Sequence, residues 1–267
     1  MGNFTNKSRY TVQDLLEIVA LLRDKDNGCP WDKEQTHQSI KNNFIEETYE
    51  VVDAIDTHDD KALCEELGDV LLQVAFHAQM AGEENRFCFD DVSDGICKKL
   101  IYRHPHIFGQ ITANTTEEVL TNWEALKEKE KHIESAAQNL NAVPRALPAL
   151  IRSRKVQKRA AAYGFTYPDV QGALADLESE ITELKEAITE NTNVAEELGD
   201  VLFSVANVSR FVKVEAEEAL AASTDKFTAR VATAEILAEE NGQALKQLNA
   251  QQLDDLWKQA KKVSTKK

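Results

Sequence analysis

The octapeptide EELGDVLL occupies residues 65–72, and EELGDVLF occupies residues 196–203. The two copies start 131 residues apart, and an acidic segment precedes each one: FIEETYEVVDAI at 44–55 and LESEITELKEAI at 177–188. Self-similarity at a fixed spacing indicates repeated structural units. Apolar residues recur at helical spacing in all four segments, so we expect two copies of one helical unit.

The rest of the chain also favours helices. The 267 residues include only 10 Gly and 5 Pro, and no segment shows sustained alternation of β-branched residues, so we expect an all-α fold. We place an N-terminal helical unit at 1–110 and a C-terminal unit at 149–267. A helical linker at 111–148 separates them, and it opens with a capping-box spacing at Thr115. A non-helical loop is expected at 27–36.

Composition excludes several classes of function. A hydrophobic fraction of 42% and a charged fraction of 29% are typical of a soluble globular protein. The formal net charge of -15 disfavours binding to nucleic acid polymers and to anionic membranes. No apolar run approaches the roughly 20 residues that span a bilayer, and no signal peptide is evident, so we expect a cytoplasmic protein. The four cysteines form no CxxC pair and are interpreted as reduced thiols.

Each of the four repeated segments carries two carboxylates three residues apart, beside its apolar stripe. At about 100° per residue, such a pair shares one helix face. Two antiparallel helices would bring four carboxylates together, and these would repel one another without a cation. The expected sets are Glu47, Glu50, Glu66 and Asp69 in the N-terminal half, and Glu180, Glu183, Glu197 and Asp200 in the C-terminal half.

A set of carboxylate oxygens favours a hard cation, Mg²⁺ with Mn²⁺ as a substitute, over zinc. Such a cation engages phosphates and water, so phosphoryl chemistry is expected. A di-iron centre would use ExxH where this chain has ExxD. His77 shares the carboxylate face, but its counterpart is Val208, so we interpret His77 as a core residue. For any single helix, a solvated acidic face is the alternative.

A Lys and an Arg follow each EELGD motif four residues apart: Lys99 with Arg103, and Lys226 with Arg230. One helical turn separates the members of each pair, so both cations lie on one face. They are candidates for clamping phosphates, with a solvated helix edge as the alternative.

EETYE followed by EELGD resembles the EExxE…ExxD signature of the MazG nucleotide pyrophosphohydrolases. The resemblance continues through GCPWDKEQT at 28–36, RHPHIF at 103–108, VPRALPAL at 143–150 and QKRAAAYGF at 157–165. It implies a homodimer of tandem MazG-like units, in which each unit contributes antiparallel helices to a four-helix-bundle core across the dimer. It also implies Mg²⁺-dependent hydrolysis of common NTPs and dNTPs to monophosphate and pyrophosphate, with broad base specificity.

Carried over to this chain, the resemblance assigns metal binding and catalysis to the four C-terminal carboxylates, and substrate binding to five further residues. Trp257 is either a stacking face for the base or a buried anchor of the last helix. The N-terminal carboxylates, with Lys99 and Arg103, form a second equivalent site. The five substrate-binding residues are Glu196, Asn207, Lys226, Arg230 and Trp257.

The two copies differ at the first position of EExxE, where Glu46 in the first copy corresponds to Ser179 in the second. Glu46 is expected to point away from the apolar arc, and the 27–36 loop is expected to be able to close the N-terminal site. We therefore expect the C-terminal half to be the working site.

A competing hypothesis makes the chain an acidic helical scaffold that binds a regulatory protein, with the metal as structural support. Under the enzyme hypothesis, house-cleaning of nucleotides and their control under stress would use the same chemistry, so the sequence does not separate these roles.

Overall fold

The computed structural model describes residues 5–113, 115–130 and 135–264. Over these ranges every regular element is an α-helix or a short 3-10 helix, and no strand is present, which confirms the all-α prediction. The chain divides into two compact units, residues 1–127 and 128–267, which are described separately below. The finer division with a linker at 111–148 stays a prediction, and residues 131–134 of that linker lie outside the described residues.

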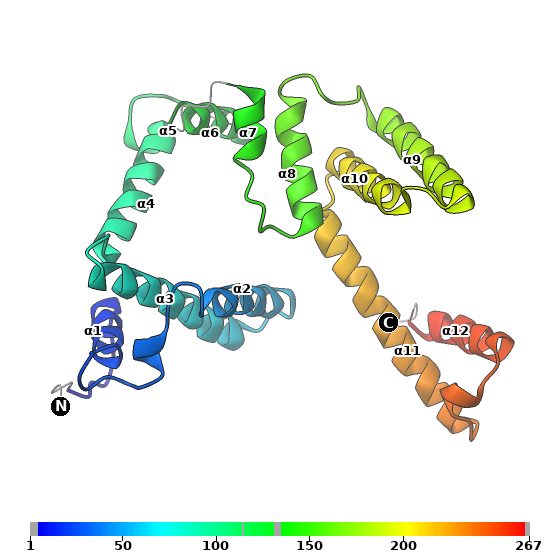
Figure 1. Ribbon diagram of the computed structural model, residues 1–267, viewed down its shortest axis with the longest axis horizontal. Coiled ribbons are helices and arrows are strands. Elements are labelled where there is room, and N and C mark those ends of the chain that lie inside the picture. The colour runs from blue at the N-terminus through cyan, green and yellow to red at the C-terminus, as the bar shows by residue number, and fades with distance from the viewer. Residues whose placement is uncertain (1–4, 114, 131–134, 265–267) are drawn as a thin grey trace. The chain divides into compact units, whose positions relative to one another are not determined.

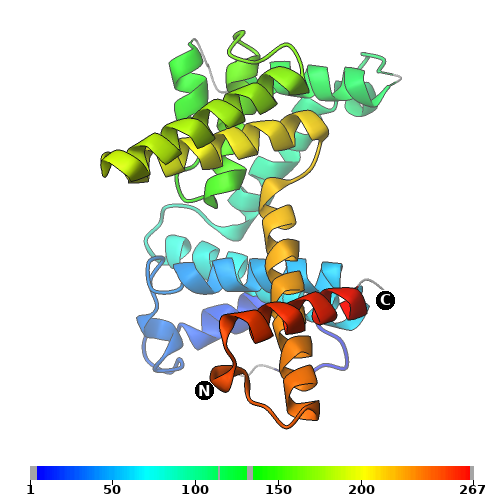
Figure 2. The same ribbon diagram turned by 90° about the vertical axis from the view of Figure 1, so that its right-hand side faces the viewer.

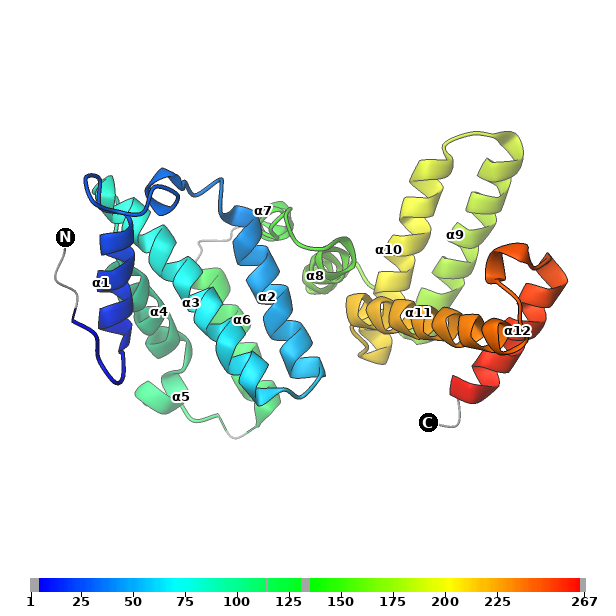
Figure 3. The same cartoon turned by 90° about the horizontal axis from the view of Figure 1, so that it is seen from below.

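The first unit is built around two long helices, α2 and α3, which lie side by side (Figure 3). Helix α1 packs against α3 and forms the core with it, through Val19, Ala75, Phe76 and Met80. The elements that begin in this unit are α1 (Val12–Leu22), η1 (Asp32–Glu34), α2 (Lys41–Asp56), α3 (Asp60–Glu83), α4 (Phe89–Arg103), α5 (Pro105–Phe108) and α6 (Thr116–Glu130).

The second unit repeats the helix pair as α9 and α10 (Figure 1). Helix α8 packs against α10, and α12 packs against the later part of α11 through Ala234, Ala238, Leu256 and Ala260 (Figure 2). The elements are α7 (Ala136–Asn141), α8 (Ala149–Ala161), α9 (Val170–Glu190), α10 (Val194–Val212), α11 (Ala216–Glu240), η2 (Leu245–Gln247) and α12 (Ala250–Ser264). None of the described helices is long and apolar enough to span a membrane.

Short turns force both helix pairs to run antiparallel. In the first unit, the turn uses His58 at a φ of 56°, and the side chain of Asp59 caps α3 by accepting from the backbone N–H of Lys61 and Ala62. In the second unit, Asn191 and Asn193 have φ values of 54° and 21°. Asn and His adopt left-handed backbone more readily than most other residues, so both turns suit their sequences.

The loop at 27–36 is not entirely irregular, contrary to our expectation. It contains the 3-10 helix Asp32–Glu34, because the guanidinium of Arg23 holds the backbone there. Arg23 is 8% exposed and donates to the carbonyl oxygens of Asp32 (2.6 Å) and Gln35 (3.1 Å). It also forms a bidentate ion pair with Glu83, with Nε 2.9 Å from Oε1 and Nη2 2.8 Å from Oε2.

The hydrogen bonds from Arg23 lower the pKa of Glu83 below its usual range. A depressed folded pKa stabilises the folded state at pH values above the unfolded pKa. That stabilisation is lost as the pH falls through the folded pKa.

Replacing Glu83 by Gln should loosen this loop. The buried guanidinium loses its anionic partner, which should cost on the order of 2 kcal/mol. Amide hydrogen exchange of residues 24–36 should therefore accelerate roughly 30-fold, as measured by mass spectrometry. Glu84→Gln is the matched control, because Glu84 pairs with Arg86 at the surface and exposed pairs contribute little. Equal acceleration in both variants would refute this role for Arg23.

Candidate functional site

In the second unit, three carboxylates predicted from the sequence come together between α9 and α10. Oxygen atoms of Glu180, Glu183 and Glu197 all lie within 4.8 Å of one another. Glu180 and Glu183 are one helical turn apart on α9, while Glu197 lies in the first turn of α10. The antiparallel turn therefore places the carboxylate-bearing faces of α9 and α10 opposite each other, as the sequence pattern predicts.

Asp200 completes this cluster electrostatically. Partial burial, then repulsion from Glu183 and Asp200, raises the pKa of Glu180 above its usual range. The same causes raise the pKa of Glu197, with a smaller contribution from the exposed Glu196 beside it. The cluster therefore resists carrying its full negative charge unless a cation is present.

Two neighbouring side chains orient these carboxylates. Ser179 donates a hydrogen bond from its hydroxyl to Oε1 of Glu183 at 3.2 Å. Asn193 donates from its side-chain amide to Oε1 of Glu197 at 2.7 Å. The departure from the EExxE pattern at Ser179 thus supplies a hydrogen-bond donor where the first copy has the exposed Glu46.

The first unit contains the equivalent cluster. Oxygens of Glu47, Glu66 and Asp69 lie within 4.8 Å of one another. Burial and Asp69 raise the pKa of Glu47, and a hydrogen bond with Glu50 contributes. Burial, Glu50 and Asp69 likewise raise the pKa of Glu66. All four predicted carboxylates are therefore neighbours here as well.

Both clusters fit a hard divalent cation. Octahedral Mg²⁺ with oxygens at about 2.1 Å separates its ligands by roughly 2.9 to 4.2 Å, which small side-chain rotations would reach from the observed spacing. The donors are carboxylates in both units, a set suited to Mg²⁺ or Mn²⁺.

His77 does not join the first cluster. Its Nδ1 lies 2.7 Å from Nδ1 of His37, and Arg86 approaches Nε2 of His37 at 2.5 Å. The guanidinium of Arg86 can only donate, so Nε2 of His37 accepts and Nδ1 of His37 carries the proton that it donates to His77. His77 is half-buried, not a fully buried core residue as expected, and its ring is hydrogen-bonded to His37 in the segment that precedes α2.

A cavity of about 500 Å³ lies beside the C-terminal cluster. Helices α8, α9 and α10 and the segment 164–167 form its walls. Both cluster carboxylates and predicted nucleotide contacts face it: its lining includes Glu180, Asp200 and Asn207. The cavity is large enough for part of a small organic ligand.

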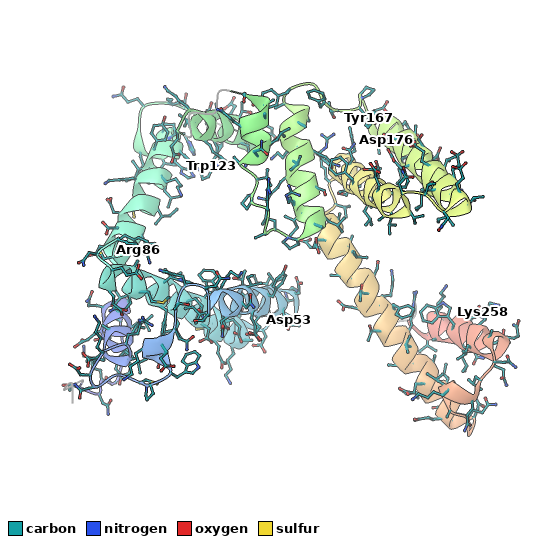
Figure 4. All side chains as sticks on the ribbon, viewed as in Figure 1. Asp53, Arg86, Trp123, Tyr167, Asp176 and Lys258 are labelled. Atoms are coloured by element: carbon teal, nitrogen blue, oxygen red, sulfur yellow. The ribbon has the colours of Figure 1, made fainter. Side chains whose placement is uncertain are left out.

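Asp176 lies in the wall of this cavity, next to Tyr167 (Figure 4). It accepts hydrogen bonds from the hydroxyls of Tyr167 and Ser204, one on each oxygen. The bond to Asp176 raises the pKa of Tyr167 to about 12. Because both of its oxygens are engaged, Asp176 is interpreted as a fixed wall residue.

The predicted phosphate-binding residues lie on α11, and Trp257 lies on α12. Lys226 is exposed, while Arg230 is half-buried with its guanidinium 5.9 Å from the centre of the Trp257 ring. Within the described part of the chain, the buried Nε of Arg230 has no hydrogen-bond partner. Trp257 also packs against Phe227 at 5.2 Å. These residues are not among those that line the cavity.

The first unit has a matching arrangement that sequence reasoning missed. Arg103 is 7% exposed, with its guanidinium 5.4 Å from the centre of the Trp123 ring, while Lys99 is exposed. Trp123 lies within the range 111–148 that the sequence analysis interprets as a helical linker. Its correspondence to Trp257 was detectable as a Trp that follows the Lys–Arg pair in each half.

A model of the MazG nucleotide pyrophosphohydrolase domain matches residues 35–108 and 169–234, and each matched segment contains one carboxylate cluster. The nucleoside triphosphate pyrophosphohydrolase of Escherichia coli strain K12 is 40% identical over 255 residues, covering 94% of this chain and 97% of that protein. The nucleoside triphosphate pyrophosphohydrolase/pyrophosphatase MazG of Thermotoga maritima is 41% identical over 249 residues, covering 93% of this chain and 95% of that protein. The chain therefore belongs to the MazG family of nucleotide pyrophosphohydrolases.

Proposed function

We propose that the chain is a Mg²⁺-dependent hydrolase that converts NTPs or dNTPs and water to the monophosphate and pyrophosphate, with broad base specificity. The observation that carries this proposal is the cluster of Glu180, Glu183 and Glu197 at the edge of a cavity sized for a ligand. The names of the relatives from Escherichia coli and Thermotoga maritima support the same reaction. We propose cytoplasmic action in house-cleaning or in the control of nucleotides under stress.

In this proposal, Glu180, Glu183, Glu197 and Asp200 hold the cation. Mg²⁺, when bound, would supply charge neutralisation for phosphate oxygens and lower the pKa of water. A cluster carboxylate orients the attacking water at the α-phosphorus and accepts its proton. The bond from the α-phosphorus to the bridging oxygen breaks, and pyrophosphate leaves.

Lys226 and Arg230 are proposed to bind the remaining phosphates. Arg230 supports this role because its guanidinium has a buried Nε without a hydrogen-bond partner in the described residues, and a guanidinium can bind phosphate with two parallel bonds. The contact between Trp257 and Arg230 favours the anchoring role considered for Trp257. Glu196, exposed next to Glu197, is proposed to lie at the edge of the bound nucleotide.

We propose that the second unit forms a homodimer through α9 and α10. A monomer leaves large apolar side chains of these helices exposed, and an exposed apolar surface of this kind marks an interaction site. Two antiparallel pairs would then form a four-helix bundle. The exposed residues are Ile181 (37%), Ile188 (59%), Leu198 (48%), Leu202 (48%) and Val205 (39%).

Product analysis tests the reaction. With Mg²⁺, an NTP should yield NMP and pyrophosphate, and orthophosphate should appear only after a pyrophosphatase is added.

Glu183→Gln should lower kcat at least 100-fold, because it removes a cation ligand, whereas Glu50→Gln should have little effect if the C-terminal half works alone. Glu178→Gln, an exposed change on the same helix, is the control. Direct release of orthophosphate by the unaltered chain would refute the proposed reaction.

Calorimetric titration with Mn²⁺ tests the clusters independently of turnover. The chain should bind Mn²⁺ at both, and Glu66→Gln and Glu197→Gln should each remove one class of site. Affinity should fall as the pH decreases through the raised pKa values of these carboxylates, because protonated carboxyls do not bind the ion. Binding that is unaffected by either substitution would place the ion elsewhere.

Light scattering coupled to size exclusion tests the dimer. The unaltered chain should elute with twice the mass of one chain, and Ile188→Glu should shift it towards the monomer because it places a charge in the apolar interface. Ile236→Glu, on the exposed face of α11, should leave the dimer intact. A monomeric unaltered chain would contradict the proposed bundle.

A further inference from the structure

The cavity beside Glu180 and Asp200 contains two side-chain amides, those of Gln157 on α8 and Asn207 on α10. They are close to each other: Gln157 contacts the backbone of Phe203, which is one helical turn before Asn207. No step of the proposed hydrolysis uses Gln157. The hydrogen-bond partners of Gln157 and Asn207 determine where the oxygen and the nitrogen of each amide lie.

One hydrogen bond fixes the orientation of the Gln157 amide. Its Nε2 donates to the carbonyl oxygen of Phe203 at 2.7 Å, and a carbonyl can only accept, so the orientation of the amide is fixed. Gln157 is 6% exposed, and its Oε1 has no hydrogen-bond partner within the described part of the chain. An unsatisfied buried acceptor costs about 1–3 kcal/mol, which a donor on a ligand would relieve.

In Asn207 the amide atom without a partner in the described part of the structure is the nitrogen, which is a donor. Its Oδ1 accepts from Nε and Nη2 of Arg210 at 3.2 and 3.1 Å. A guanidinium can only donate, so the oxygen must face Arg210 and Nδ2 must face away from it. Arg210 is itself held by Thr166, whose hydroxyl accepts from Nη2 at 2.7 Å. Among the described residues, Nδ2 of Asn207 has no acceptor.

We propose that this cavity binds the nucleobase, with Gln157 as a fixed hydrogen-bond acceptor and Asn207 as a fixed donor for its edge. Arg210 is a positioning residue that sets the polarity of Asn207. The inference rests on the proposed function, since the phosphates of the same nucleotide would reach Glu180 and Asp200 at the edge of the cavity.

Aromatic side chains at the cavity suit a planar ligand. Phe165 is 75% exposed and Phe203 is 43% exposed, and both belong to the cavity lining. Exposed aromatic rings of this kind offer stacking faces that accept any base, because every base has a π-face. The base can therefore be held without a contact from Trp257.

An acceptor paired with a donor explains broad specificity. Each common base carries an adjacent acceptor and donor on its Watson–Crick edge: N1 and the N6 amine in adenine, N3 and the N4 amine in cytosine, O6 and N1–H in guanine, and O4 and N3–H in uracil. The pair formed by Gln157 and Asn207 therefore meets adenine and cytosine in one orientation of the base and guanine and uracil in the turned-over orientation, and it rejects a ligand that lacks such an edge.

The most direct test replaces the hydrogen-bond donor of Asn207 by an acceptor. In Asn207→Asp, Arg210 keeps its partner and the outward atom becomes an acceptor, so the cavity presents two acceptors. Among the four bases, guanine alone offers two adjacent donors, N1–H and the N2 amine. The ratio of kcat/KM for GTP to that for UTP should rise at least tenfold over the unaltered chain. Asn141→Asp, which makes the same charge change at an exposed position of α7, should leave the ratio unchanged.

A second variant removes the acceptor without adding charge. Gln157→Met should raise KM for every NTP about tenfold, while the inhibition constant of inorganic tripolyphosphate, which has no base, stays within twofold. Arg210→Met should raise KM in the same way by releasing the Asn207 amide, and Arg210→Lys should restore part of the loss. Gln171→Met, exposed on α9, is the control, and circular dichroism verifies that each variant is folded.

The outcomes separate the two proposals. If the unaltered chain turns over NTPs, but Asn207→Asp leaves the GTP preference unchanged or Gln157→Met weakens tripolyphosphate as much as NTPs, the base-binding role is overturned and the hydrolase stands. If the unaltered chain releases no NMP and pyrophosphate, the proposed function is overturned, and the base-binding role falls with it.

Discussion

Mutual repulsion among converging carboxylates is the constraint on which the proposed site depends. Short turns hold α9 against α10 and α2 against α3, so acidic residues one helical turn apart on each helix face those of its neighbour. Burial and repulsion raise the pKa values of Glu47, Glu66, Glu180 and Glu197. Such an arrangement is relieved by protonation, by separation of the side chains or by a divalent cation. We propose that a cation is the relevant relief at neutral pH, because the short turns keep the helices together.

The helical part of this arrangement could be predicted from the sequence because helical spacing is local. The repeated EELGD motif, the faces of Glu180 and Glu197, and the all-α class all follow from spacing over a few residues. The polar anchors could not be predicted in this way. Gln157 bonds to the backbone carbonyl of Phe203, 46 residues away, and any residue at 203 would offer that carbonyl. The 3-10 helix at Asp32–Glu34 likewise depends on backbone contacts with Arg23.

The two units differ in ways that favour the second as the working half. Ser179 donates a hydrogen bond to Glu183, while its counterpart Glu46 is an exposed carboxylate. Arg103 is buried against Trp123, whereas the half-buried Arg230 has an Nε without a hydrogen-bond partner among the described residues. The cavity with the two oriented amides belongs to the second unit. The first unit retains the carboxylates, which is consistent with metal binding in both halves and with catalysis in one.

A crystal structure of the chain grown with Mn²⁺ and a non-hydrolysable NTP analogue would test the central claim most directly, because anomalous scattering locates the ion. We predict a peak bounded by Glu180, Glu183, Glu197 and Asp200 and shared with phosphate oxygens of the analogue. A peak remote from these four residues, or none while their side chains extend into solvent, would contradict the account.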